Sequence, residues 1–323
     1  MIDVIAERAP LGGLERWLDD PSIDEVIVNG RGDVWIECAG SLRHVGTMSR
    51  TAVMSATEHI LRPIGRRIDR SNPMVDARLP DGSRVCAVIE PIAVDGPCLT
   101  IRRFSVCTRP LSAFAPPAVA TLLQTIVESR CNVLVSGATS SGKTTLLNSL
   151  VALVAAGERL ITLEDIAELQ LPHPHVVRLE ARPANAEGSG EVTLAHLLRT
   201  ALRMRPDRLV LGEVRGAEAV QLVQAMNTGH DGSMATVHAN SALDALARLC
   251  SLVLQEVPGW PLEAIHDQVG RSIDVVIHVG RNLDSRRHVV EVCESDASSA
   301  GGVRLRPLAD HESVVNTLTR RRQ

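Results

Sequence analysis

Hydrophobic and polar positions follow two different patterns along the chain. The first part holds short apolar stretches separated by turns rich in Pro, Gly, Asn and Asp, with one helical stretch at 51–61. Apolar runs of this length between turn residues are typical of strands. The strand candidates lie at 24–30, 33–37, 84–89 and 99–104, the first two around an Asn-Gly turn. This pattern predicts an α+β domain.

From Pro117 onward, short apolar strands alternate with helical patterns. The helical periodicity is clearest where apolar residues repeat at i, i+3, i+4, i+7 and i+8, at Leu194, Leu197, Leu198, Ala201 and Leu202. The strand candidates are 132–136, 160–163, 208–211 and 234–238, with further strands at 274–279 and 288–292. Alternation of this kind predicts a parallel sheet covered by helices, and therefore an α/β domain.

Prolines mark the boundary between the two patterns. Pro110, Pro116 and Pro117 interrupt regular structure, because proline lacks the backbone N–H that helices and central strands need. We therefore expect a smaller N-terminal domain at 1–104, a linker at 105–117 and a second domain at 118–323.

Composition narrows the class of protein. Hydrophobic residues make up 45% of the 323 residues and charged residues 22%, which is typical of a globular protein. Aromatic residues are only 2% and the net charge is −4, so we expect no direct binding of nucleic acid. The seven cysteines form no Cys-x-x-Cys pair, and no signal peptide or membrane span is evident. These features predict reduced thiols, no zinc site and a cytoplasmic location.

The strongest motif is Gly137-Ala-Thr-Ser-Ser-Gly142-Lys143-Thr144, which fits G-x-x-x-x-G-K-[ST] between an apolar strand and a helical stretch at 145–154. Glycines let the backbone curl around a phosphate, the helix N-terminus faces the anion, and lysine adds a positive charge. An incidental Gly/Ser-rich turn is the alternative, which the strand–loop–helix context makes weaker. The predicted nucleotide-binding residues are Gly137, Thr139, Ser140, Ser141, Gly142, Lys143, Thr144 and Thr145.

Hydrolysis needs a carboxylate that orients the attacking water, at the end of a neighbouring strand. Glu213 follows the apolar strand 208–211 and is our candidate base, although a solvated loop glutamate is the alternative. Glu164 and Asp165 end another strand, where Glu164 is a candidate ligand of Mg²⁺ through water. The predicted Mg²⁺ site therefore combines Thr144, Glu164 and Glu213.

His238 ends the strand 234–238 and is a candidate sensor of the γ-phosphate, although a lone histidine is more often a structural residue. Phosphoryl transfer also benefits from an arginine at the transferred phosphate. Arg215, beside Glu213, is one candidate in the second domain. The first domain offers others among the seven arginines at 66–103, although most surface arginines are simply solvated.

Taken together, these elements resemble the type II/type IV secretion and pilus ATPase family, and within it most closely the ATPase of the tight-adherence (Flp) pilus system. The resemblance extends over nearly the whole chain. It includes the phrases at 24–30, 73–84, 99–104, 201–208 and 225–232 as well as the motifs above.

The resemblance implies a RecA-like P-loop ATPase domain behind an α+β, PAS-like N-terminal domain, assembled as a homo-hexamer that binds ATP and Mg²⁺. Lys143 and Thr144 match the Walker A pair, and Glu213 matches the Walker B glutamate. The remaining matches are Glu164 to the acidic box, His238 to the His box, and Arg84 with Arg102 or Arg103 to N-domain arginines that contact the phosphates. It also implies an integral-membrane platform protein as partner, and peripheral attachment to the inner face of the cytoplasmic membrane through such partners.

This sequence departs from the family in two respects. Ala138 and Ser140 stand in the phosphate loop where relatives often have glycine, and the chain starts close to the N-terminal domain. The four-cysteine zinc element of some type II secretion ATPases is absent, which favours the tight-adherence branch. The expected function is a Mg-ATP motor for pilus assembly or protein secretion. Two alternatives are a conjugation or type IV secretion motor, and a regulatory subunit that binds ATP without hydrolysing it.

Overall fold

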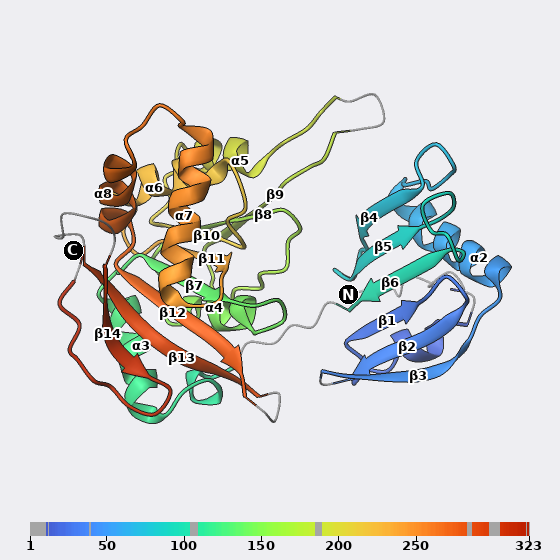
Figure 1. Ribbon diagram of the computed structural model, residues 1–323, viewed down its shortest axis with the longest axis horizontal. Helices are drawn as coiled ribbons and strands as arrows, with labels where there is room; N and C mark the ends of the chain where they lie inside the picture. Colours follow the sequence, from blue (N-terminus) through green and yellow to red (C-terminus); the bar gives the residue numbers. More distant parts are fainter. Residues whose placement is uncertain are drawn as a thin grey trace. The chain divides into compact units, whose positions relative to one another are not determined.

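The structure is a computed structural model that describes residues 11, 13–38, 40–103, 109–184, 189–282, 286–296, 304–320 and 322. The chain divides into two compact units, unit 1 at residues 1–106 and unit 2 at residues 107–323 (Figure 1). The division falls inside the segment 105–117 that the sequence assigns to a linker. Phe104, the linker residues 105–108 and Arg321 lie outside the described residues.

Unit 1 is built on a six-stranded antiparallel sheet with the order β3-β2-β1-β6-β5-β4. Alternate residues such as Val26 and Ile101 face a core shared with α2, whose first turn is capped by Ser49. The elements are α1 (Glu15–Leu18), β1 (Glu25–Val28), β2 (Asp33–Cys38), β3 (Ser41–Thr47), α2 (Arg50–Leu61), the 3-10 helix η1 (Arg62–Ile64), β4 (Met74–Arg78), β5 (Arg84–Val88) and β6 (Cys98–Arg102).

Unit 2 is built on an eight-stranded sheet with the order β14-β13-β12-β7-β11-β10-β8-β9. The six neighbouring strands β12, β7, β11, β10, β8 and β9 run parallel to one another. Strand β13 pairs antiparallel with β12, and β14 pairs antiparallel with β13. The strands are β7 (Val133–Gly137), β8 (Leu160–Glu164), β9 (Val176–Glu180), β10 (Arg208–Leu211), β11 (Met234–His238), β12 (Val275–Arg281), β13 (Arg287–Asp296) and β14 (Arg304–Asp310).

Helices cover both faces of the unit 2 sheet (Figure 1). One core joins the sheet to α5–α8 and the other joins it to α3 and α4, which explains why β7, β8 and β10 are buried along their whole length. The helical elements are η2 (Leu111–Ala113), α3 (Pro117–Glu128), α4 (Lys143–Val151), α5 (Leu194–Ala201), α6 (Glu218–Asn227), α7 (Ala242–Glu256) and α8 (Leu262–Ser272).

Because the central strands are parallel, their carboxyl ends meet at one end of the sheet. We call this the carboxyl end; it comprises Gly137, Glu164, Leu211–Glu213, His238 and Arg281. The opposite, amino end comprises Asn132, Glu158, Arg208, Asp231 and Asp274, which lie at or just before the starts of these strands.

Several elements differ from the sequence-based expectation. The sequence analysis gives no range for β3, β4, β9 and β14, or for the helices α1, α3, α6, α7 and α8. The edge strands β3 and β9 lack a fully buried face that would produce clear alternation. Pro117 does not interrupt regular structure but begins α3, where its missing N–H is harmless. Phe114 and Ala115, inside the predicted linker, are buried in the core of unit 2.

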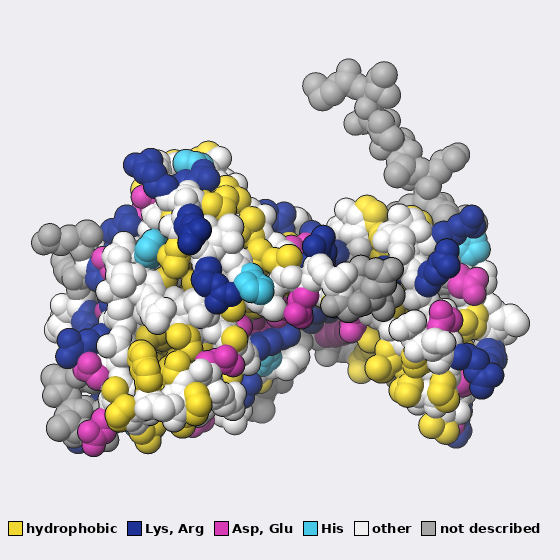
Figure 2. Space-filling view, turned by 90° about the horizontal axis from the view of Figure 1, so that it is seen from above, with side chains coloured by type: hydrophobic (Ala, Val, Ile, Leu, Met, Phe, Trp, Pro, Cys, Tyr) yellow, Lys and Arg dark blue, Asp and Glu magenta, His cyan; other side chains and the backbone are white. Residues whose placement is uncertain are grey.

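Two further properties concern helix length and the distribution of surface charge. None of the described helices is long and apolar enough to cross a membrane. On the face in Figure 2, Lys and Arg side chains lie among Asp and Glu side chains rather than in one continuous basic area.

Candidate active site

The predicted nucleotide-binding loop connects β7 to α4, with Lys143 as the first residue of the helix. Two glycines allow the loop to fold tightly. A Cβ on Gly137 would lie 2.4 Å from Ser141 Oγ and 2.5 Å from the Val279 carbonyl oxygen. Gly142 has φ 102°, a left-handed conformation that favours glycine, and a Cβ there would lie 2.7 Å from Arg287 Cδ. The loop therefore places the N-terminus of α4 at the carboxyl end of the sheet.

Lys143 is buried beneath this loop. Its Nζ donates to the carbonyl oxygens of Gly137 at 3.1 Å and Ala138 at 2.9 Å, and lies 3.3–3.4 Å from the ring nitrogens of His238. The neighbourhood follows from sheet register, because β11 pairs with β7 so that His238 is opposite Gly137. Burial lowers the pKa of Lys143, although the carboxylate of Glu213 opposes the change.

Glu213 joins this group from the end of β10. Arg215 binds its carboxylate with two nitrogens, at 2.7 Å to Oε1 and 2.8 Å to Oε2, and His238 Nε2 lies 3.4 Å from Oε2. The backbone before Glu213 is fixed, since the Gly212 N–H donates to Leu163 and its carbonyl accepts from the Thr236 hydroxyl. The structure thus brings four predicted residues together: Lys143, Glu213, Arg215 and His238.

The charges in this group tune one another. Burial alone would raise the pKa of Glu213, but the hydrogen bond and charge of Arg215, with His238 and Lys143, hold it below its usual range. Burial and the Lys143 charge lower the pKa of His238. At neutral pH the group therefore contains an ionised Glu213 and a neutral His238, which suits a carboxylate that orients water.

Glu164 lies behind this group, packed against Gly212, where a Cβ would come within 2.8 Å of Glu164 Cγ. Its Oε1 accepts from the backbone N–H groups of Glu168 at 2.9 Å and Leu169 at 2.8 Å. Burial raises the pKa of Glu164 to about 7 against these two hydrogen bonds. The residue therefore fixes the turn after β8, with Oε2 available for another contact.

The loop chemistry fits a nucleoside triphosphate with Mg²⁺. The Ser141 hydroxyl is buried and has no hydrogen-bond partner among the described residues, and the same holds for Glu164 Oε2. Within the described ranges, no three His, Cys, Asp or Glu side chains are arranged to hold a metal by themselves. A Mg²⁺ ion here would therefore rely on Thr144, on water held by Glu164 and Glu213, and on phosphate oxygens.

The arginines predicted in the N-terminal domain lie on the sheet of unit 1. Arg84 of β5 is directly opposite Arg102 of β6, which in turn is opposite Glu25 of β1. The Arg103 guanidinium donates to the Asp20 carbonyl, and its backbone N–H donates to Asp24 at 2.8 Å. Contact of these arginines with phosphate stays a prediction.

Sequence reasoning missed two arginines beside the phosphate loop. Arg281, at the end of β12, donates from Nε to the Ser140 carbonyl at 3.0 Å. Arg287, at the start of β13, donates to the Thr145 hydroxyl at 3.2 Å. No local motif marks either residue. The position of Arg281 at the end of a strand could have indicated it, because a strand that pairs in parallel with β7 must end beside the loop.

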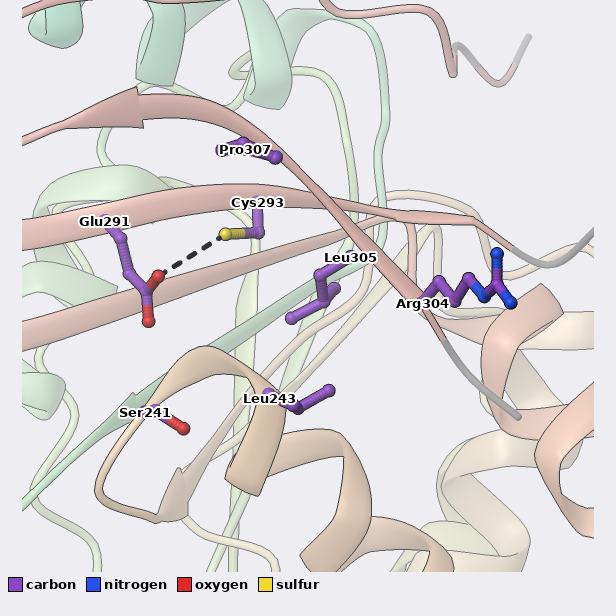
Figure 3. A pocket seen from close by; sticks show the side chains of 7 residues that line it. All are labelled: Ser241, Leu243, Glu291, Cys293, Arg304, Leu305 and Pro307. Carbon is purple, nitrogen blue, oxygen red and sulfur yellow. Dashed lines mark hydrogen bonds between the residues drawn. The ribbon is translucent and has the colours of Figure 1, made fainter. Parts of the chain in front are cut away.

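A separate cavity of about 540 Å³ lies between the start of α7 and strands β13 and β14 (Figure 3). Glu291 closes one side, where it accepts from the Ala242 N–H at 2.8 Å and lies 3.6 Å from Cys293 Sγ. Burial raises the pKa of Cys293 to about 12, so the thiol stays protonated. Its lining residues are Ser241, Leu243, Glu291, Cys293, Arg304, Leu305 and Pro307, none of which belongs to the phosphate loop.

The site combines a lysine-containing loop with a nearby carboxylate, as nucleotide hydrolases do. A comparison with protein families shows to which family the chain belongs. The family described as type II/IV secretion system protein matches residues 7–315. The chain belongs to this family.

Relatives of this secretion-system protein match most of its length. A Mycobacterium tuberculosis H37Rv protein, provisionally named a conjugal transfer protein, is 40% identical over 299 residues, or 88% of this chain and 84% of the relative. VirB11, a type IV secretion system protein of Brucella suis biovar 1, is 34% identical over 315 residues, or 86% of this chain and 87% of the relative.

Among solved structures, the pilus retraction motor PilT with bound ADP matches with a TM-score of 0.62. The match covers 96% of this chain and 84% of PilT at 18% identity, so it concerns the fold alone. The predicted secretion ATPase family and the two-part mixed α/β fold are therefore confirmed. The narrower likeness to the tight-adherence ATPase stays a prediction.

Proposed function

We propose that this secretion-family protein is a magnesium-dependent ATPase that drives a type IV secretion or pilus machine as a hexameric ring. The observation that carries the proposal is the group of Lys143, Glu213, Arg215 and His238 at the carboxyl end of the sheet. Its carboxylate lies 3.4 Å from His238, and the Lys143 ammonium lies within 3.4 Å of the same ring. The proposed phosphate ligand, Lys143, and the proposed water-orienting carboxylate, Glu213, thus lie beside the same imidazole ring, and hydrolysis needs both groups close together.

In the proposed reaction, Lys143 exchanges its two carbonyl contacts for the β- and γ-phosphates of ATP. Ionised Glu213 orients the attacking water. Neutral His238, the last residue of β11, contacts the γ-phosphate and so senses whether it is present. Arg215 limits the motion of the Glu213 carboxylate and keeps it ionised. Thr144, with Glu164 and Glu213 through water, would hold a Mg²⁺ ion, which would supply positive charge to the phosphates.

The ring is proposed because, among the described residues, the arginines near the Glu213 group are already engaged: Arg215 binds Glu213, and Arg281 and Arg287 bind the loop at Ser140 and Thr145. Transition-state charge on the phosphates favours a further guanidinium. Arg84, Arg102 and Arg103, from this chain or a neighbouring copy, are the proposed sources. The ring would be peripheral to the inner face of the cytoplasmic membrane and would act on an integral-membrane platform protein.

Two machines fit this motor. The conjugal transfer and VirB11 names of the relatives favour type IV secretion or conjugation. The phrases at 24–30 and 73–84 favour tight-adherence pilus assembly. Deletion of the gene in the source cell separates the two, because the first machine predicts loss of transfer to recipient cells and the second predicts loss of surface pili.

The ATPase is tested by steady-state Mg-ATP hydrolysis of the purified full chain over a range of protein concentrations. Wild-type activity per molecule should rise with concentration if sites are completed between copies. Glu213→Gln should lower turnover by about 10²–10⁴-fold and keep ATP binding, the range expected for loss of a general base. Lys143→Ala should weaken ATP binding itself.

Glu263→Gln, on the exposed side of α8, is the matched control and should hydrolyse ATP like wild type. If Glu213→Gln also matched wild type, the assignment of the base would be wrong. ATP binding without turnover at any concentration, and without change on adding membranes of the source cell, would favour the regulatory alternative.

A further inference from the structure

The last residues of β12 and the first residue of β13 contact the phosphate loop at both of its ends and in its middle. The Val279 carbonyl lies against Gly137, Arg281 Nε donates to the Ser140 carbonyl at 3.0 Å, and Arg287 donates to Thr145 Oγ1 at 3.2 Å. Phosphate-binding loops act through the exact direction of their N–H groups, so a contact that fixes the loop backbone affects nucleotide affinity. These strand ends are therefore placed to set the loop conformation.

The middle of the loop needs such a contact. Ser140 has φ 59°, a left-handed conformation that residues with a Cβ adopt rarely. Unlike Gly142, which adopts φ 102° without strain, Ser140 has a side chain that disfavours its conformation. Its side chain is exposed, so core packing does not compensate for the strain.

Arg281 supplies a contact at the strained residue. Its guanidinium binds the carbonyl oxygen of Ser140, and a carbonyl changes direction when φ and ψ move toward another allowed region. A hydrogen bond from a charged donor is stronger than a neutral one, so it opposes this change. Arg287 holds the far end of the loop through the hydroxyl of Thr145.

We propose that Arg281 is a positioning residue that keeps Ser140, and with it the phosphate loop, in the left-handed conformation that ATP binding uses. The proposal rests on the ATP-binding function proposed above. It assigns Arg281 no contact with ATP: its effect is exerted through the backbone of Ser140.

The test measures Kd for Mg-ATP, KM and kcat for four proteins: wild type, Arg281→Ala, Ser140→Gly and the double variant. Arg281→Ala should raise Kd and KM about tenfold, the loss expected for one hydrogen bond to a charged group, with kcat changed less than about twofold. Arg281→Lys should recover part of the affinity, because an ammonium can still donate to the carbonyl. Melting temperatures of all variants verify that they are folded.

The decisive quantity is the coupling between the two positions. Glycine removes the strain at 140, so Arg281→Ala should raise Kd by only about twofold in the Ser140→Gly background. An equal loss in both backgrounds would mean that Arg281 attracts the phosphates directly, and would overturn the proposal. A loss confined to kcat, or no loss, would overturn it as well.

Arg286→Ala is the matched control. Arg286 lies between the same two strands, and among the described residues no hydrogen bond joins its side chain to the loop, so its removal changes charge alone. It should bind ATP like wild type; a loss equal to that of Arg281→Ala would again indicate charge and contradict the proposal.

The two proposals fail differently. If wild type bound no ATP, both would fall. If wild type bound ATP in a way that Lys143→Ala abolishes, while Arg281→Ala bound equally well, only the positioning role would fall.

Discussion

The amino and carboxyl ends of the unit 2 sheet differ in whether their buried polar groups have hydrogen-bond partners. At the amino end, Arg208 is 2% exposed and donates from Nε and one terminal nitrogen to Glu158, each at 2.8 Å. Asp274, also buried, accepts from the backbone of Asn132 and from the side chains of Arg320 and Arg322. At the carboxyl end, Ser141 Oγ and Glu164 Oε2 are buried with no partner among the described residues, and Ser140 is strained.

This difference is consistent with a stabilising role for one end and a ligand-binding role for the other. Paired buried charges hold a structure in one arrangement, because removal of one partner leaves the other unpaired in the interior. Unpaired polar atoms and strained backbone destabilise a free protein, but a ligand can satisfy or exploit them. We infer that the amino end stabilises unit 2 and the carboxyl end binds nucleotide.

The largest expected effect is at the amino end. Glu158→Ala leaves the buried Arg208 without its carboxylate and also removes the carboxylate that pairs with Arg130, so the free energy of unfolding should fall by about 3–5 kcal/mol. Urea unfolding followed by circular dichroism measures the change. Glu312→Ala, whose side chain is 80% exposed, is the control and should change stability by less than about 0.5 kcal/mol. Equal losses in both variants would contradict the role of the amino end.

A smaller effect tests the carboxyl end through pH. Because burial raises the pKa of Glu164 from 4.5 to about 7, the folded state binds its proton more tightly than the unfolded state. Stability from this group is therefore present below pH 4.5 and is lost as the pH rises through 7, by about 3 kcal/mol in total.

Glu164→Gln removes this titration. The difference in unfolding free energy between wild type and the variant should therefore shift by about 3 kcal/mol between pH 4.5 and pH 8, with wild type relatively less stable at high pH. Urea unfolding at several pH values measures it, and the exposed Glu263→Gln serves as control. A difference independent of pH would mean that Glu164 is ionised throughout and fit to bind Mg²⁺ directly.

The smallest effect concerns the C-terminal tail. Arg322 pairs with Asp274 at 2.6 Å and with Asp231 at 2.7 Å. Arg322→Ala leaves Asp274 with Arg320 and the Asn132 N–H as partners. We expect a loss of about 1–3 kcal/mol in the free energy of unfolding. Arg271→Ala, which removes an exposed helix pair with Asp267, should cost at most about 0.5 kcal/mol. If Arg322→Ala were as mild, the tail would not stabilise the amino end.

Much of the candidate site was predictable because it lies at strand ends. Glu213 and His238 each follow a short apolar run, and parallel strands bring such residues together whatever their separation in sequence. Edge elements were less predictable: β3 and β9 have mixed exposure, and Pro117 looked like an interruption although it begins a helix. The roles of Arg84, Arg102 and Arg103 depend on contacts between units and stay predictions.

The sequence alone determined the phosphate loop, its strand and helix, and the order of the acidic and histidine strand ends, because these depend on local periodicity and short motifs. Tertiary structure decided that β12 lies beside β7, which brings Arg281 to Ser140 across 141 residues. It also decided that Glu164 is buried enough for a pKa of about 7, and that Arg322 reaches Asp274. Burial and long-range pairing depend on strand order and packing, which no local spacing encodes.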